Sequence, residues 1–466
     1  MDNYKIRFEP FNILHIKTFT GFFGVNEHAT ISFSGTIEKD KEEEYTNLGT
    51  SSTEVSVYAF DMEGNEELWF KGVVTDIEIK VDIDYKTIFV TAKTGSYLMD
   101  VSWHTRTYQE PSLTYDEVLS SFTKDYPQGS FIMKKGSGIP INDLIMQYKE
   151  TDWSFTKRLA SHFNTIVIPD YKAGGAKYYF GIKNSSSASD FDTVAYIVKS
   201  DTEQYDHKVK HGVSLSKSDT TYYIAKERTI YNLGESVTIN GKALFISKIE
   251  TTLEGAELYH TYYLKPLNGF QVEKCYNLRT VGASFDAKVL DVKKDVVQVE
   301  VERDENKGSC GVRWFPYSTV YSTPDGTGWY TMPEIGDSVR MYIPTEGEAE
   351  AYVISATHLE SSDTSERVNP DYKSIMNKHK KEVLFKPDEL IITNNDGMSI
   401  EILDEEGIKI ISDKKIIIQS EEGVSIASTK SDLKVTAVDT ILLKQNETTT
   451  ELTDNIEFDG AKIHLD

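Results

Sequence analysis

The 466-residue sequence is poor in cysteine and in positive charge. Its two cysteines, Cys275 and Cys310, match no disulfide or metal-binding spacing, so we expect both to be reduced bystanders. Lysine and arginine number 50 against 74 aspartates and glutamates, which gives a formal net charge of -24. Because nucleic-acid binding depends on basic side chains that neutralise phosphates, this charge excludes a nucleic-acid partner.

Long apolar runs are also missing. No stretch approaches the roughly 18 apolar residues that a membrane-spanning helix needs. The N-terminus, Met1–Tyr4, does not begin the charged-then-apolar pattern of a signal peptide. We therefore expect a protein that is made and assembled in the cytoplasm.

The usual catalytic motifs are absent as well. The sequence holds no His-Glu-x-x-His, no Gly-x-Ser-x-Gly and no phosphate-binding Walker loop. Acidic clusters such as Glu42–Glu44 and Asp404–Glu406 are interpreted as solvated loop charges, because paired-carboxylate catalysis needs a cleft. We expect no enzymatic activity, no catalytic residue and no organic cofactor.

The most regular feature is the C-terminal run from about Leu390 to Asp466, where apolar residues return every eight positions. The series begins at Ile392, and from its second member each apolar residue is followed two positions later by another. It slips by one residue after the fifth repeat and contains a polar Thr448/Thr450 step. The predicted core positions are Ile400, Ile402, Ile408, Ile410, Ile416, Ile418, Val424, Ile426, Ile441, Leu443, Ile456 and Phe458.

This period predicts a β-helical needle. Apolar and polar residues alternate within each octad, so each octad is one short strand with one buried face, followed by a turn. A single-chain β-helix generally needs coils of about twenty residues or more, so octads require other chains to complete each layer. Three copies around a common axis would close every layer and leave no free sheet edge. The alternative is an ordinary sheet with chance spacing.

The rest of the chain predicts a mainly β protein with several domains. Residues 1–275 read as two β-barrels with a helical insert at about 110–165, because short alternating strands surround segments of helical period. Residues 276–358 contain five strands and fit an OB-fold barrel. Residues 359–389 form a polar linker or neck, and residues 390–466 form the octad needle.

Three helices are expected outside the needle. Two lie in the insert, at Thr114–Phe122 and Thr151–Phe163, the second capped by Thr151 or Asp152. A third, short helix is expected in the linker at about Tyr372–Lys381. These helices interrupt a chain that otherwise consists of short strands.

Histidines supply the candidate metal ligands. His464 falls on the octad register, which would place three imidazoles around the axis at the tip of a trimer; a slip of one residue would instead leave it in solvent. His207 and His211 stand four apart, a spacing that suits a metal only on a helix. Their surroundings indicate strand or loop, so they are interpreted as two surface histidines.

Several strings in order resemble the VgrG family and its phage relatives of the late control D type, the hub-plus-spike proteins of contractile injection systems. These strings are Leu98–Asp100, Arg106–Glu110, Ile145–Leu159, Gly326–Val339 and Asn369–Lys373, followed by the octads. The resemblance spans nearly the whole chain and implies a tube-docking hub and membrane-puncturing spike, as in phage tail baseplates, tailocins and type VI secretion.

The resemblance also implies partners. These are a homotrimer, a hexameric tail-tube protein at the hub end, baseplate proteins, a PAAR-like tip protein or effector at the needle end, and a target cell envelope. Two alternatives are a β-helical tail-spike enzyme that degrades polysaccharides and an adhesin. The first predicts longer coils with a grooved carboxylate cluster, and the second predicts exposed aromatic platforms; the octads show neither pattern.

Overall fold

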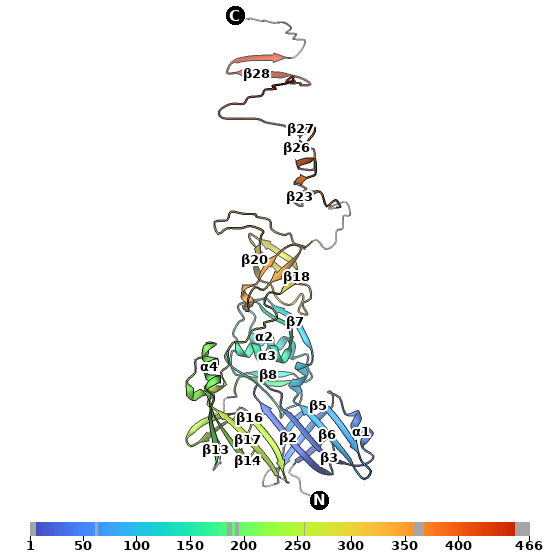
Figure 1. Cartoon of the computed structure of the whole chain (residues 1–466), viewed down its shortest axis with the longest axis vertical. Coiled ribbons are helices and arrows are strands. Elements are labelled where there is room, and N and C mark those ends of the chain that lie inside the picture. Colours follow the sequence, from blue (N-terminus) through green and yellow to red (C-terminus); the bar gives the residue numbers. More distant parts are fainter. Residues whose placement is uncertain are drawn as a thin grey trace. The chain divides into compact units, whose positions relative to one another are not determined.

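The computed structural model describes residues 6–60, 64–183, 189–191, 195–255, 257–357 and 368–452. The chain divides into two compact units, residues 1–359 and 360–466, which are described separately. Both are built mainly of strands, as predicted (Figure 1). In the described ranges, no helix is long and apolar enough to cross a membrane.

A twelve-stranded sheet forms the base of the first unit. It joins the strands predicted for two barrels, because β2 pairs with β16, and one hydrophobic cluster runs through both halves. Its main path, in order of pairing, is β1 (Ile6–Glu9), β4 (Glu54–Phe60), β5 (Glu66–Val81), β6 (Lys86–Lys93), β3 (Thr30–Ile37), β2 (His15–Gly24), β16 (Lys242–Glu254), β17 (Glu257–Lys265), β14 (Thr221–Glu227) and β13 (Tyr196–Ser200). β15 (Ser236–Ile239) pairs with β16 and with β12 (Ser189–Asp190).

The predicted helical insert lies between the two halves of this sheet in sequence. It contains α2 (Tyr115–Thr123) and α3 (Asp152–Ser161). Thr114 and Glu117 form a reciprocal capping box at the start of α2, and the Thr151 hydroxyl caps α3. The strands of the insert are β7 (Trp103–Tyr108) paired with β9 (Ile145–Thr151), and β8 (Ser130–Met133), β10 (Val167–Pro169) and β11 (Lys177–Phe180) in a three-stranded sheet.

A closed five-stranded barrel follows, as the OB-fold prediction requires. Its strands are β18 (Ser284–Lys293), β19 (Val296–Val301), β20 (Trp314–Ser318), β21 (Ser338–Tyr342) and β22 (Tyr352–Ile354). Leu144 and Met146, from the end of the insert, belong to the same buried cluster as the barrel core. The barrel and the insert therefore share one hydrophobic core.

The second unit begins with an antiparallel meander. Its strands are β23 (Lys373–Met376), β24 (Glu382–Phe385), β25 (Glu389–Thr393), β26 (Met398–Leu403) and β27 (Gly407–Ser412), and a separate hairpin of β28 (Ile441–Gln445) and β29 (Thr448–Leu452) follows. The prediction of a linker helix at Tyr372–Lys381 was wrong. The Asn377 side chain accepts hydrogen bonds from the backbone N–H groups of His379 and Lys381, which stabilises a turn between β23 and β24 instead of a helix.

Two short helices were not predicted. Glu42–Glu44, interpreted as loop charges, begin α1 (Glu42–Asn47), where acidic residues suit the positive end of the helix dipole. The segment of His207 and His211, expected as strand or loop, is α4 (Thr202–Lys210), capped by the Asp201 side chain. Single-turn 3-10 helices complete the set: η1 (Gly95–Asp100), η2 (Lys217–Thr220), η3 (Leu267–Phe270) and η4 (Glu348–Glu350).

Candidate assembly surface

The predicted core isoleucines form a stripe on one face of the meander. Ile392 lies opposite Ile400, Ile400 opposite Ile410, and Ile402 opposite Ile408. Directly opposed residues of an antiparallel pair share a face, so the octad period places these side chains together. The neighbouring pair Glu401 and Lys409 lies on the other face. Three consecutive octads therefore pair with one another within the chain.

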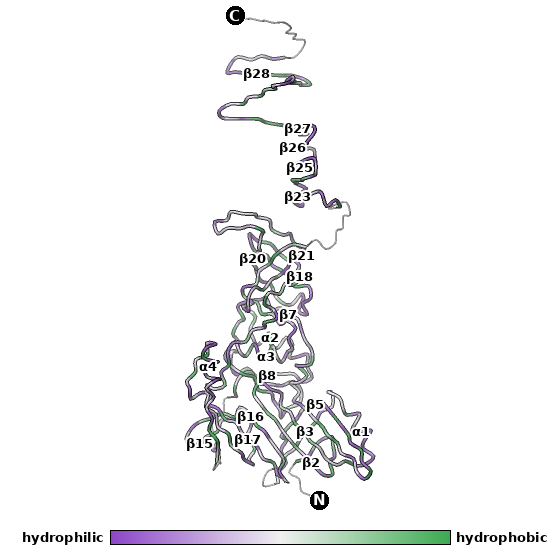
Figure 2. The backbone as a smooth tube through the Cα atoms, in the orientation of Figure 1, coloured by the Kyte–Doolittle hydropathy of each residue, from purple (hydrophilic) through white to green (hydrophobic). Residues whose placement is uncertain are grey.

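This stripe is not covered. Ile408 and Ile410 are 70% and 58% exposed, and Ile400 and Ile402 are 42% and 45% exposed. Figure 2 shows hydrophobic segments in this unit as well as in the strands of the first unit. Contiguous apolar surface on a soluble chain marks a contact with another molecule.

Residues 414–440 have no strand partner in the described chain. The structure assigns them no strand and records no backbone-to-backbone hydrogen bond among them. Their predicted core residues Ile416, Ile418, Val424 and Ile426 are 51% to 69% exposed. Backbone N–H and C=O groups are normally satisfied by pairing, so this stretch exposes both apolar side chains and backbone groups that no strand of the described chain pairs with.

The last predicted core positions are only partly described. Ile441 is half-buried and Leu443 is exposed in the β28–β29 hairpin, where Leu443 lies opposite Thr450. Ile456, Phe458 and the candidate metal ligand His464 lie outside the described residues. The proposed metal at the needle tip stays a prediction.

A buried polar joint in the first unit was not predicted, although two of the quoted strings supply it. The Arg106 Nη1 donates to Gln147 Oε1 at 2.9 Å and to Asp152 Oδ1 at 2.5 Å. Gln147 Nε2 and the Tyr126 hydroxyl also donate to Asp152, at 2.7 and 2.6 Å. Burial and this hydrogen bond to Asp152 raise the pKa of Tyr126. The carboxylate is 1% exposed, so the Arg106 guanidinium and these hydrogen bonds take the place of water around it.

A second buried cation links α3 to the OB barrel. Arg158 donates from Nε to both carboxylate oxygens of Glu150 at 3.1 Å, and from Nη1 to Glu348 Oε1 at 3.2 Å. Burial raises the pKa of Glu348, and the Arg158 charge opposes that shift. His162, at the end of the same helix, has a pKa lowered to about 3 by burial and by the positive charges of Arg158 and Lys274. These contacts fix the orientation of the barrel on the insert.

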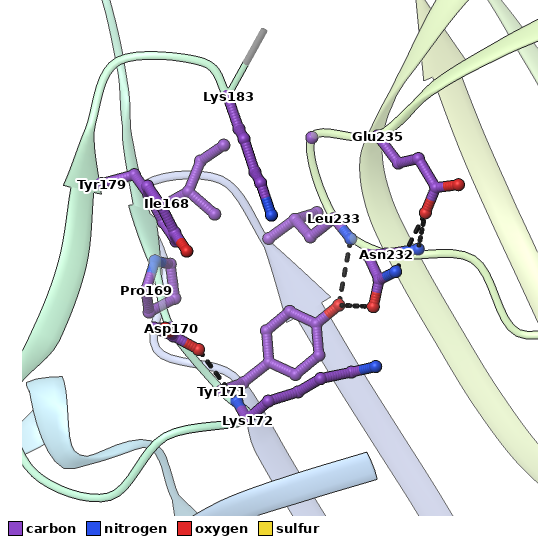
Figure 3. Close-up of a pocket in the computed structure, with 11 residues that line it drawn as sticks. Ile168, Pro169, Asp170, Tyr171, Lys172, Tyr179, Lys183, Asn232, Leu233 and Glu235 are labelled. Atoms are coloured by element: carbon purple, nitrogen blue, oxygen red, sulfur yellow. Dashed lines mark hydrogen bonds between the residues drawn. The ribbon is translucent and has the colours of Figure 1, made fainter. Parts of the chain in front are cut away.

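Figure 3 shows a pocket of the first unit. It has a volume of about 510 Å³ and lies between Ile168–Lys172 and the turn at 232–235. The Tyr171 hydroxyl accepts a hydrogen bond from the Leu233 N–H at 3.1 Å, and Lys172 pairs with Glu67 at 2.7 Å. The Tyr171–Leu233 hydrogen bond thus joins the two walls of the pocket, and no nucleophile with an adjacent base is among the residues that line it.

No family model and no curated protein matches the sequence. Solved structures do. The E. coli c3393 protein, a component of the type VI secretion system described as similar to the T4 bacteriophage tail proteins gp27 and gp5, matches 76% of this chain over 100% of its own, with 13% identity and a TM-score of 0.54. The chain has a VgrG-like fold. In the half-lidded Francisella PdpA-VgrG complex, a chain matches 85% of this one over 83% of its own length, with 10% identity and a TM-score of 0.57.

The lidless PdpA-VgrG complex gives a similar result: 85% of this chain, 93% of the matched chain, 9% identity and a TM-score of 0.56. At such identities the likeness extends to the fold. It agrees with the VgrG resemblance seen in the sequence strings, two of which supply the Arg106–Asp152 joint of this fold.

Proposed function

We propose that this chain is the non-enzymatic hub and spike of a contractile injection apparatus, acting as a homotrimer. The first unit docks onto a hexameric tail-tube protein and the baseplate. The octads of three chains wind into a needle that carries a PAAR-like tip protein or effector and punctures the target cell envelope. The particle is assembled in the cytoplasm and the spike is expelled on contraction.

The observation that carries this proposal is the exposed isoleucine stripe together with the unpaired stretch at 414–440. A chain with the VgrG-like fold has here an apolar face and free strand groups that its own residues do not cover. Intertwined copies would bury both at once, which makes a stiff and dry shaft. A mechanical role follows from that stiffness and requires no active site.

The test is the solution mass of the full-length chain, measured by light scattering beside that of a chain truncated after residue 371. We expect a mass of three chains for the full-length protein and a mass of fewer than three chains for the truncated one. A full-length monomer would contradict the proposal. If the truncated chain were still a trimer, the trimer contacts would lie in the first unit, and the octads would not be needed for association.

A further inference from the structure

An arm of the OB barrel carries exposed aromatic side chains. The arm is the part of the connection between β20 and β21 that spans residues 319–332. Its Tyr321, Trp329 and Tyr330 are 52%, 57% and 74% exposed. Large exposed aromatic side chains that gather in one segment mark a contact with another molecule.

Backbone pairing gives the arm a defined shape. An antiparallel bridge joins Ser322 and Gly328, and the Trp329 N–H donates to the Tyr321 carbonyl oxygen at 2.8 Å. In this register Tyr321 lies directly opposite Trp329, so the two side chains share one face of the arm. Glycine is required at position 328, because its φ is +140° and an added Cβ would clash with the Tyr321 carbonyl oxygen.

The arm is tied to the turn between the first two strands of the barrel. The Tyr330 hydroxyl donates to the carbonyl oxygen of Lys294, between β18 and β19, at 2.9 Å. OB barrels bind oligonucleotides or oligosaccharides along their second and third strands and the neighbouring loops. In this barrel the second and third strands are β19 and β20, so the arm continues directly from one of them.

The arm is also nearly neutral and rich in hydroxyl groups. Of its fourteen residues, seven carry a hydroxyl and only Asp325 carries a charge, although 27% of the whole chain is charged. The Asp325 carboxylate is used within the arm, where it accepts hydrogen bonds from the Thr323 hydroxyl and the Thr327 N–H. The arm therefore provides aromatic rings for stacking and hydroxyls for hydrogen bonds, but no free charge for an ionic ligand.

We propose that the face of Tyr321 and Trp329 binds a neutral polysaccharide, with sugar rings stacked on the two aromatic side chains. Thr323 and Thr327 lie two positions further along the same face, where their hydroxyls meet those of the sugar. The net charge of -24 excludes the other ligand class of OB barrels, nucleic acid. The site needs only one chain, so it does not depend on the proposed trimer.

The test is co-sedimentation of the full-length chain with three insoluble neutral polysaccharides: chitin, cellulose and raw starch. We expect binding to at least one of them. Trp329→Ala and Tyr321→Ala should each weaken it by roughly 10-fold or more, as substitutions of aromatic residues at the centre of a contact do. Trp329→Phe keeps a ring and should retain most of the binding. Gly328→Ala keeps every ring but breaks the pairing of the arm, so it should weaken binding as strongly as Trp329→Ala.

Trp103→Ala is the matched control, because Trp103 is 68% exposed in the same unit but lies on β7. It should bind like the natural chain. Light scattering tests whether the arm instead contacts a second copy, and we expect Trp329→Ala to keep the solution mass of the natural chain. The proposal is overturned if the natural chain binds none of the three polysaccharides, if Trp103→Ala weakens binding as much as Trp329→Ala, or if Trp329→Ala lowers the solution mass.

Discussion

The two units of the chain differ in whether they bury their apolar side chains. The first unit buries many of its large ones, among them Trp153, Phe155 and Tyr178, each at most 2% exposed. In the second unit none of residues 368–451 is buried. Both units contain alternating strands, so alternation alone does not decide whether a strand finds its core within its own chain.

What differs is the width of the apolar surface. The strands of the first unit belong to a twelve-stranded sheet, a closed barrel and the two small sheets of the insert, and their apolar faces form three buried clusters within the unit. The octads make a narrow sheet of short strands, which has no second layer within the described part of its own unit to cover its apolar face. Because burial contributes about 25 cal/mol for each Å² of apolar surface, the octads gain little stability until other chains cover them. The first unit therefore folds from its own contacts, and under the proposed function the second unit gains its core when copies of the chain associate.

The largest effect on the difference between the two units is expected from polar substitutions in the isoleucine stripe. We expect Ile402→Thr with Ile408→Thr to destabilise the trimer by about 2 kcal/mol for each side chain that association buries, counted over three chains. Light scattering at increasing guanidinium concentrations would show that the variant trimer dissociates at a lower guanidinium concentration than the natural one. The melting of the first unit should not change.

The matched control changes the other face of the same strands. Glu401 and Lys409 are directly opposed, as Ile402 and Ile408 are, so Glu401→Thr with Lys409→Thr alters the same two strands in the same register. Lys409 forms its ion pair with Glu406, and such an exposed pair contributes only about 0.2–1 kcal/mol, so this variant should stay trimeric. Equal shifts for the two variants would show that the stripe is not the buried face.

The reverse experiment weakens the first unit alone. Arg158→Ala leaves the carboxylates of Glu150 and Glu348 without their cation in a buried place, and we expect a loss of about 3–5 kcal/mol in the free energy of unfolding. Urea unfolding followed by tryptophan fluorescence measures it. The solution mass of the assembled protein should stay the same.

Arg340 provides the comparison for this variant. It pairs with Asp286 at 2.6 Å, but the two side chains are 37% and 54% exposed. Arg340→Ala should therefore cost about 1 kcal/mol or less. If both arginines cost the same, the Arg158 joint would be no more than a surface ion pair.

Much of this architecture follows from sequence because its signals are local. The five strands predicted within residues 276–358 are the five strands of the closed barrel. Thr114 and Thr151 are capping residues, and capping depends on side chains within three or four positions. The octad period predicted the isoleucine stripe because alternate residues of a strand share a face, and strands that recur every eight residues bring their apolar positions to the same face.

The features that the sequence did not predict depend on distant contacts or on competing local signals. Arg106 meets Asp152 across 46 positions, and no short-range pattern announces such a pair. The α4 helix was not predicted because its polar residues give little apolar periodicity, although the Asp201 cap was a usable signal. The linker helix failed because Asn377 favours a turn through its own side chain.

The smallest expected effect concerns a buried histidine of the first unit. His260 is 1% exposed; its Nδ1 is hydrogen-bonded with the Thr251 hydroxyl at 2.8 Å, and burial lowers its pKa from 6.5 to about 4. As the pH falls below 6.5, His260 therefore takes up a proton in the unfolded chain but stays neutral in the folded chain. The resulting stability is complete above pH 6.5 and is lost as the pH falls from 6.5 towards about 4. Between about pH 7.5 and 5.5 the loss is about 1.4 kcal/mol.

Urea unfolding of the first unit at these two pH values measures the effect. We expect His260→Gln to reduce the pH-dependent loss by that amount, whatever it does to stability at neutral pH. His379→Gln, which changes an exposed histidine of the second unit, should leave the loss unchanged. If both substitutions reduced the pH-dependent loss of stability equally, burial of His260 would not be the cause of that loss. The two units would then not differ in this respect.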